Sequence, residues 1–78
     1  MKLYVYSLEK PMFEGEAVSV SLPTEAGEIT VLNQHVPLVT TLAPGTIRIK
    51  QEKGADVHIP LTGGYGEVSR KKMIVLMR

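Results

Sequence analysis

Residues 27–49 read GEITVLNQHVPLVTTLAPGTIRI, and this stretch decides the fold of the chain. Two short apolar segments, 29–32 and 38–42, are separated by a non-helical loop in which Pro37 fixes the backbone. Pro44-Gly45 then turns the chain into the alternating segment 47–50. This succession of strand, loop, strand, turn and strand predicts a β protein with short connections.

Alternation of apolar and polar residues continues outside this stretch. A period of two gives a strand one buried and one exposed face. We expect the apolar faces to carry Leu3 and Val5; Val18, Val20 and Leu22; Ile47 and Ile49; and Val57, Ile59 and Leu61. Since no helix-length window shows the apolar spacing of an amphipathic helix, the chain is expected to be all-β.

Turn residues separate the strands at short intervals. Glu52-Lys53-Gly54 predicts a hairpin tip, and Pro60, which lacks a backbone donor, predicts an edge strand or a bulge. The sequence Gly63-Gly64-Tyr65-Gly66 predicts a bulged strand with close backbone approach. We therefore predict one domain over residues 1–78, a small two-sheet β-sandwich or flattened barrel of mostly antiparallel short strands.

For two segments, the sequence does not decide whether the side chains are covered by this chain or exposed to a partner. Residues 73–77, MIVLM, are apolar on both faces, so this strand is either covered on both sides or lies at a partner interface. Tyr4 and Tyr6 share one face of the first strand, where they either cover the sandwich or form part of an exposed binding patch.

Composition excludes several classes of function. The 78 residues include no cysteine, so neither a disulfide nor a thiolate nucleophile can form. Nine basic and eight acidic residues give a net charge of +1, which creates no long-range field toward nucleic acid or an anionic membrane. No apolar run approaches the roughly 20 residues that span a bilayer, and we expect no signal peptide.

Catalytic and metal-binding patterns are not expected either. His35 and His58 are the only histidines, and His58 is expected on the solvated face of its strand. Asp56 is the only aspartate, and nothing positions it to orient a histidine toward a serine. Glu25 and Glu28 are interpreted as exposed loop charges. The glycine-rich segment lacks the order of a phosphate-binding loop. We therefore predict no enzyme, no metal and no cofactor.

A nucleic-acid-binding barrel is the alternative from another class. The run Arg70-Lys71-Lys72 supplies cations, while Tyr4, Tyr6 and Tyr65 could stack on bases. No second basic stripe accompanies them. This alternative predicts oligonucleotide affinity that falls steeply with salt.

An ordered set of motifs carries a resemblance to a known family. Met12-Phe13-Glu14-Gly15 comes first, residues 27–49 follow, then Gly63-Gly64-Tyr65-Gly66-Glu67-Val68, and finally the strand 73–76. This order resembles the amino-terminal β-domain of the epsilon subunit of F-type ATP synthases, and it covers essentially the whole chain.

The resemblance implies a non-catalytic rotor subunit in the central stalk, which links the gamma subunit to the membrane c-ring during proton-driven ATP synthesis. It implies a peripheral position at the cytoplasmic face of the bacterial inner membrane, held there by the complex. The loop 24–29 is expected to face the ring through Thr24, Glu25, Glu28 and Ile29. The expected gamma-facing residues are Ser7, His35, Val36, Pro37, Leu38 and Thr40; His35 could instead hydrogen-bond its own loop.

The chain departs from the family pattern in two places. Asn33-Gln34 stands where members commonly have Pro-Gly or Pro-Asn, and Asn33 is expected to let the turn form because asparagine tolerates the left-handed region. The sequence ends at Arg78 and holds no carboxy-terminal helical hairpin. The inhibitory and ATP-binding roles that the hairpin has in the family are therefore not assigned.

Overall fold

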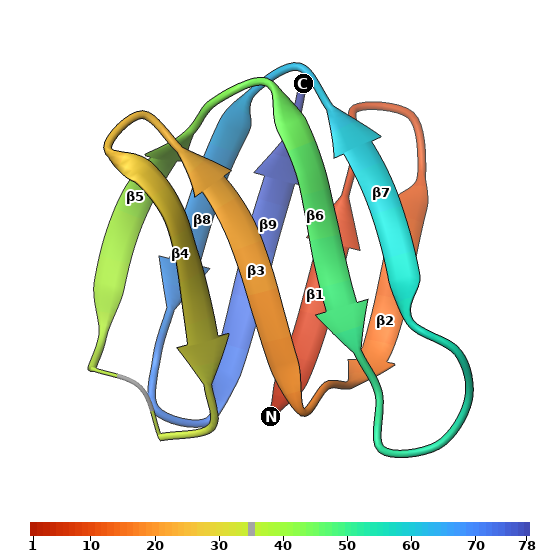
Figure 1. Ribbon diagram of the computed structural model, residues 1–78. Coiled ribbons are helices and arrows are strands. Elements are labelled where there is room, and N and C mark those ends of the chain that lie inside the picture. The colour runs from red at the N-terminus through yellow and green to blue at the C-terminus, as the bar shows by residue number, and fades with distance from the viewer. Residues whose placement is uncertain (35) are drawn as a thin grey trace.

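The computed structural model describes residues 1–34 and 36–78 (Figure 1). Within them the chain forms nine strands and no helix long and apolar enough to cross a membrane. The strands are β1 (Lys2–Tyr6), β2 (Pro11–Glu16), β3 (Ser19–Thr24), β4 (Gly27–Leu32), β5 (Leu38–Leu42), β6 (Gly45–Lys50), β7 (Val57–Leu61), β8 (Gly64–Val68) and β9 (Lys72–Met77).

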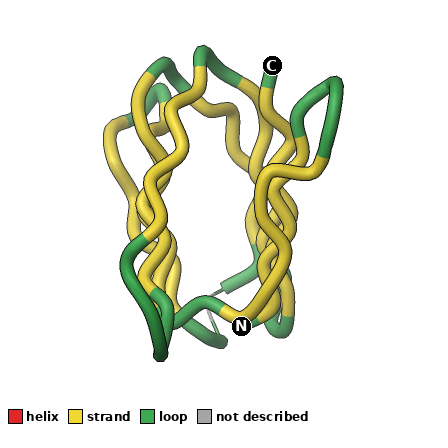
Figure 2. The backbone as a smooth tube through the Cα atoms, turned by 90° about the vertical axis from the view of Figure 1, so that its right-hand side faces the viewer, coloured by secondary structure: helices red, strands yellow, loops and turns green. Residues whose placement is uncertain are grey.

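The strands form two layers that face each other (Figure 2). One layer has the order β2-β1-β9-β8-β5, and the other has the order β4-β3-β6-β7. They join where β3 meets β5 at the single pair Thr24–Leu42. Every pairing is antiparallel except that of β1 with β9. The predicted all-β sandwich of mostly antiparallel strands is therefore confirmed.

The core lies between the layers and follows the predicted alternation. In β1, Leu3 and Val5 are fully buried, and in β6, Ile47 and Ile49 are. Burying such a side chain contributes about 1.5–3 kcal/mol. The other buried apolar residues are Ala17, Val20, Leu22, Val31, Leu42, Ile59, Leu61, Val68, Met73, Val75 and Met77.

The prediction that Val18 lies on the apolar face of its strand is wrong. Val18 is 44% exposed, and Ala17 is buried in its place. The alternation breaks because residues 17 and 18 carry the chain from one layer to the other: Ala17 N donates to Met1 O at 2.8 Å, and Val18 N donates to Lys50 O at 2.7 Å. The regular strand starts only at Ser19.

The predictions for Gly54 and Pro60 are confirmed, and the prediction for the glycine-rich segment at Gly64 is confirmed in part. Gly54 has a φ of 96° in the connection between β6 and β7, and Pro60 lies on β7, the edge strand of its layer. Close approach at Gly64 is confirmed, since a Cβ there would lie 2.0 Å from Leu76 O. The expected bulge is wrong, because β8 keeps a continuous register with β9 from Gly64–Met77 to Val68–Met73.

The last strand is covered on one face by this chain. Met73, Val75 and Met77 point into the core. On the opposite face, Ile74 is half-buried and Leu76 is 51% exposed. Of the two surroundings that the sequence left open, coverage on both sides does not hold within the described residues.

Candidate interaction surfaces

The segment predicted as a ring-facing loop is a tight hairpin. Thr24 ends β3 and Gly27 begins β4, so only Glu25 and Ala26 form the turn. The Thr24 hydroxyl donates to Gly27 O and accepts from Ala26 N at 3.2 Å. Thr24 is 7% exposed, because its side chain secures the turn from the inside. The hairpin presents Glu25 at its tip and keeps Thr24 beneath it.

Glu28 is exposed, as expected, but it lies on a strand and has a partner. Its Oε1 lies 2.6 Å from Nη2 of Arg48 on β6, and both side chains are about half exposed, at 50% and 53%. An exposed ion pair of this kind contributes about 0–1 kcal/mol. The interaction therefore orients Glu28 without holding it tightly. Ile29, the neighbouring residue, is half-buried and packs against the core.

Residues 36–40 show two different environments. Val36 is 74% exposed and Pro37 is also exposed, whereas Leu38 packs against the core. Thr40 is half-buried, with its methyl group 3.6 Å from the position of a Cβ on Gly66. Sequence reasoning missed Val39, which is 72% exposed. Alternation from the buried Leu42 would have identified Val39 as the outward residue.

The turn that leads into β5 differs from the expectation in one residue. Gln34, with a φ of 68°, occupies the left-handed region that we expected Asn33 to adopt. Both side chains are exposed. His35, a predicted gamma-facing residue, lies outside the described residues.

Ser7 stabilises the turn between β1 and β2. Its hydroxyl accepts from Glu9 N at 3.3 Å and Lys10 N at 3.1 Å, and donates to Lys10 O at 3.0 Å. Its own N–H also donates to Lys10 O at 2.9 Å. The turn thus ordered presents Leu8, which is 88% exposed and which sequence reasoning did not single out.

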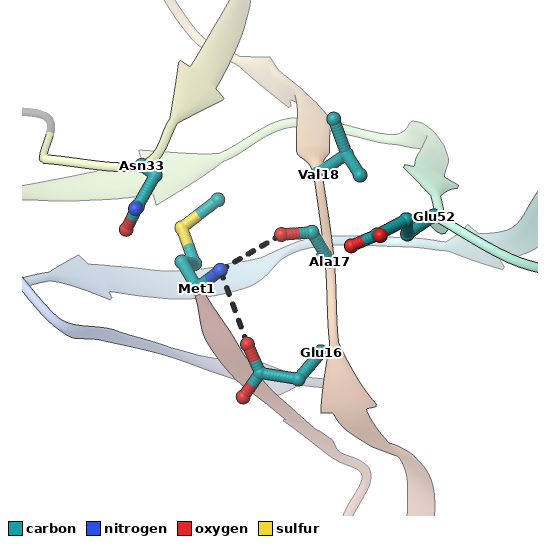
Figure 3. Close-up of a pocket in the computed structure, with 6 residues that line it drawn as sticks. All are labelled: Met1, Glu16, Ala17, Val18, Asn33 and Glu52. Atoms are coloured by element: carbon teal, nitrogen blue, oxygen red, sulfur yellow. Dashed lines mark hydrogen bonds and ion pairs between the residues drawn. The ribbon is translucent and has the colours of Figure 1, made fainter.

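A pocket of about 230 Å³ surrounds the amino terminus (Figure 3). The Met1 ammonium donates to Ala17 O at 2.9 Å and lies 3.4 Å from Glu16 Oε1. The Met1 side chain is 2% exposed, and the two interactions of the ammonium hold β1 against the end of β2. Val18, Asn33 and Glu52 complete the lining. The Met1 ammonium and the Glu16 carboxylate are therefore already engaged with each other.

A second depression, of about 380 Å³, lies on the polar outer face of the layer formed by β4, β3, β6 and β7. Its polar lining comes from β3, β6 and the start of β7, and consists of Ser19, Ser21, Arg48, Lys50, Asp56 and His58. His58 is exposed, as predicted. Among residues 1–34 and 36–78, no group of three or more metal-ligating side chains comes together.

These features define a class of protein. The described part of the chain is an all-β sandwich that places exposed apolar residues at its turns and on one sheet face. The chain belongs to the family of ATP synthase Delta/Epsilon chain β-sandwich domains, whose model matches residues 1–78. The family resemblance is thereby confirmed.

A curated relative agrees with this family assignment. The chain is 36% identical over 75 residues to the ATP synthase epsilon chain of Dichelobacter nodosus (strain VCS1703A), with 96% of this chain and 52% of the relative covered. The chain therefore spans about half the length of that curated relative.

Two solved structures share the fold. A chain in the mitochondrial ATP synthase of Euglena gracilis, solved as OSCP, F1 and c-ring in rotational state 1, superposes with a TM-score of 0.89 at 23% identity; 96% of this chain and 48% of that chain are covered. A chain in the central stalk and c-ring of the Tetrahymena thermophila mitochondrial ATP synthase superposes with a TM-score of 0.85 at 13% identity, covering 97% and 61%.

Proposed function

We propose that this chain is the β-domain of a non-catalytic epsilon subunit, which links the gamma subunit of an F-type ATP synthase to the membrane c-ring. The match of the family model across residues 1–78 carries this proposal. Its relative from Dichelobacter nodosus is named an ATP synthase epsilon chain, and the two solved structures come from assemblies that include a c-ring. The subunit sits peripherally at the cytoplasmic face of the bacterial inner membrane, attached through the complex.

The mechanical role suits the way the layers are joined. Backbone pairing continues from β2 through β5 and β3 to β7, so one path of hydrogen-bonded strands connects both layers. Side chains from both layers form one buried core between them, and protein interiors generally pack as densely as organic crystals. A force applied at the β3–β4 tip therefore passes into the whole body, which lets the module transmit torque between the ring and gamma.

The ring-facing contact is assigned to the β3–β4 hairpin. Glu25 is exposed at its tip, and Glu28 is oriented by Arg48 with half of its side chain exposed. A basic loop on the ring can approach these carboxylates without breaking a buried interaction. Such contacts fix the orientation of the β-domain on the ring more than they contribute to the binding affinity.

The gamma-facing contact is assigned to Ser7, His35, Val36, Pro37, Leu38 and Thr40. Val36 and Pro37 offer apolar surface on a backbone that proline restricts, which lowers the entropy lost on docking. Leu38 and Thr40 support this segment from the inside. Ser7 orders the turn that presents Leu8.

Titration against purified gamma subunit, followed by calorimetry, tests the proposal. We expect one-to-one binding that weakens about tenfold or more in the double variant His35→Ala, Val36→Ser. The variant His58→Ala is the matched control, because His58 is exposed on the opposite layer. A folded wild-type chain that does not bind gamma would refute the proposal.

A further inference from the structure

The depression on the outer face of the β4-β3-β6-β7 layer gathers hydrogen-bond donors from three strands. Ser21 lies opposite Arg48, and Arg48 lies opposite His58, so one row crosses β3, β6 and β7. In the adjacent row, Ser19 lies opposite Lys50. Residues that face each other across a ladder, like residues two apart on one strand, project from the same face. We call these five residues the basic cluster; their strands belong to the layer nearer the viewer in Figure 1.

The depression exists because short and long side chains stand side by side. Ser19 and Ser21 on β3 are half-buried and short, whereas Arg48 and Lys50 on β6 are exposed and long. The surface is therefore lower over β3, and the hollow of about 380 Å³ has hydroxyl groups beside cationic groups in its lining. A small ligand in this hollow meets both kinds of donor at once.

The basic cluster supplies many donors for an oxyanion. A guanidinium carries five N–H groups, an ammonium three, and an imidazole at least one in either protonation state. Serine hydroxyls add further donors; that of Ser21 shares one hydrogen bond with Thr30, at 3.1 Å, and keeps the capacity for another. Hydrogen bonds from cationic donors to phosphate are about twice as strong as neutral ones, and the planar fork of arginine contacts two oxygens of a phosphate.

Most of these donors have no partner within the described part of the chain. No carboxylate lies within ion-pair distance of Lys50 or His58. Arg48 donates through Nη2 to Glu28 Oε1 at 2.6 Å, and its side chain is 53% exposed, so its other N–H groups remain open to a ligand. The basic cluster is therefore able to bind an anion without first breaking a buried interaction.

Two carboxylates limit the size of the anion. Glu28 lies opposite Pro23 on β3, at one end of the basic cluster. Asp56 precedes Val57, the partner of Ile49, and lines the other end of the depression. The positive region between the two carboxylates is therefore short along the strands. An extended polyanion that crossed it would meet a carboxylate at each end, whereas a compact anion would not.

The aromatic residues of the chain lie away from the depression. They are Tyr4, Tyr6, Phe13 and Tyr65, and all of them belong to β1, β2 and β8 of the other layer. Proteins that bind nucleobases use such rings as stacking surfaces. The basic cluster is therefore suited to the phosphate part of a ligand and not to a base.

We propose that the basic cluster binds one phosphate group, supplied as inorganic phosphate or as the end of a small phosphate monoester. Arg48 and Lys50 neutralise the dianion from β6. Ser19 and Ser21 donate from β3, and His58 donates from β7. This site goes beyond the proposed function and does not rest on it, because the binding requires no other subunit.

Arg48 connects this site to Glu28. The same guanidinium serves the carboxylate when the site is empty and the phosphate when it is occupied, so the two anions compete for it. Because both side chains of the ion pair are about half exposed, the pair is weak and a phosphate displaces Glu28 readily. Phosphate binding therefore releases the Glu28 side chain, and removal of the Glu28 charge strengthens phosphate binding.

Titration of the isotope-labelled chain with sodium phosphate, followed by two-dimensional NMR, tests the site. Ionic strength is held constant with sodium chloride, so that screening does not change during the titration. We expect saturable shifts of the amide signals of residues 19–21, 48–50 and 56–58, with a dissociation constant on the order of 1 mM. Shifts that do not saturate and that spread evenly over the chain would overturn the proposal.

Charge variants with opposite expected signs identify the residues. Lys50→Gln should weaken phosphate binding about threefold, whereas Glu28→Gln and Asp56→Asn should each strengthen it about twofold. Because loss of folding cannot produce a gain of affinity, the opposite signs exclude a merely structural effect. Lys71→Gln is the matched control, since Lys71 is exposed in the β8–β9 connection. An equal loss in Lys71→Gln and Lys50→Gln would overturn the assignment.

Adenosine monophosphate and adenosine distinguish the two sources of the phosphate group. Adenosine monophosphate should bind within about threefold of inorganic phosphate, because no ring is present to stack on its base. Binding tighter by about tenfold would support the phosphate site and identify a monoester as its ligand. If adenosine alone shifts the same signals with equal affinity, the site recognises the base and the proposal is overturned.

The phosphate titration contains no other subunit, so its result is separate from that of the gamma titration. A chain that binds phosphate at the basic cluster but does not bind gamma supports this site and refutes the proposed function. A chain that binds gamma but shows no saturable phosphate binding overturns this inference alone.

Discussion

At the scale of single residues, Gly64 and Gly27 are both required by the fold, but for different physical reasons. Gly64 has a φ of 145°, and a Cβ there would lie 2.0 Å from Leu76 O on the neighbouring strand. Gly27 has a φ of 116°, but a Cβ there would meet nothing within 4 Å. Both positions disfavour other residues through the backbone, whereas only Gly64 also lacks space.

The substitution Gly64→Ala is therefore expected to be severe. It combines backbone strain with a clash against a carbonyl that cannot move without breaking the β8–β9 ladder, so we expect a loss of about 3 kcal/mol or more, or failure to fold. Gly27→Ala, the matched control, should lose only about 1 kcal/mol from strain. Urea unfolding measures both, and equal losses would contradict the role assigned to the contact.

The ion pair between Glu28 and Arg48 is expected to contribute little to stability. A double-mutant cycle with Glu28→Gln and Arg48→Gln should give a coupling free energy of about 0–1 kcal/mol that decreases with salt. The single variants provide the controls within the cycle. A salt-independent coupling above about 2 kcal/mol would mean that Glu28 is held too tightly to exchange Arg48 for another partner.

At the scale of secondary structure, β9 combines a core face and a surface face in adjacent residues. Val75 is fully buried, while its neighbour Leu76 is half exposed on the outer face of the layer. The sequence alone could not separate these faces, because all residues from 73 to 77 are apolar. Neighbouring strands decide which face is buried, and periodicity carries no information about them here.

Threonine substitutions at these two positions distinguish the faces. Val75→Thr buries a hydroxyl in the core without changing the shape of the side chain, so we expect a loss of about 1–3 kcal/mol. Leu76→Thr should change the free energy of unfolding by about 0.5 kcal/mol or less. Chemical denaturation of both variants provides the measurement, and a larger loss for Leu76→Thr would mean that this residue packs inside the fold.

Sequence reasoning predicted strands well where they alternate and poorly where they end. Ile47, Ile49, Ile59 and Leu61 were placed correctly because their polar neighbours mark the other face. Val18 was misplaced because the chain changes layers there, and Val39 was missed because its neighbours in the 38–42 run are also apolar or small. The row formed by Tyr6, Leu76 and Tyr65 depends on register between strands distant in sequence, which a single sequence does not specify.

At the scale of the whole molecule, the first and last strands are neighbours in the middle of a layer. β9 lies between β1 and β8 and supplies Met73, Val75 and Met77 to the core. The layer therefore cannot close until the end of the chain is in place. Folds dominated by such long-range pairings form slowly, in milliseconds to seconds.

Removal of residues 70–78 should consequently abolish the fold. Loss of the central strand exposes both β1 and β8 and removes three buried side chains, which exceeds what a small β-sandwich can tolerate. Removal of Arg78 alone, whose N–H donates to Gly63 O at 2.9 Å and whose guanidinium lies over Gly63, is the control and should leave the fold intact. Dispersion of amide signals in NMR spectra measures the outcome; a dispersed spectrum for the longer deletion would refute this account.

The parallel pairing of β1 with β9 also determines how the molecule responds to pulling. The amino terminus and the carboxy terminus lie at opposite ends of these two strands (Figure 1). Tension between the termini therefore slides β1 along β9, and the hydrogen bonds from Lys2–Lys72 to Tyr6–Leu76 share the load together instead of opening one by one. In optical-tweezer experiments, the chain held by its termini should rupture at a higher force than the chain held by its amino terminus and the β8–β9 turn, which lie at the same end of β1 and β9. The β-sandwich is thus most resistant to tension that runs along β1 and β9.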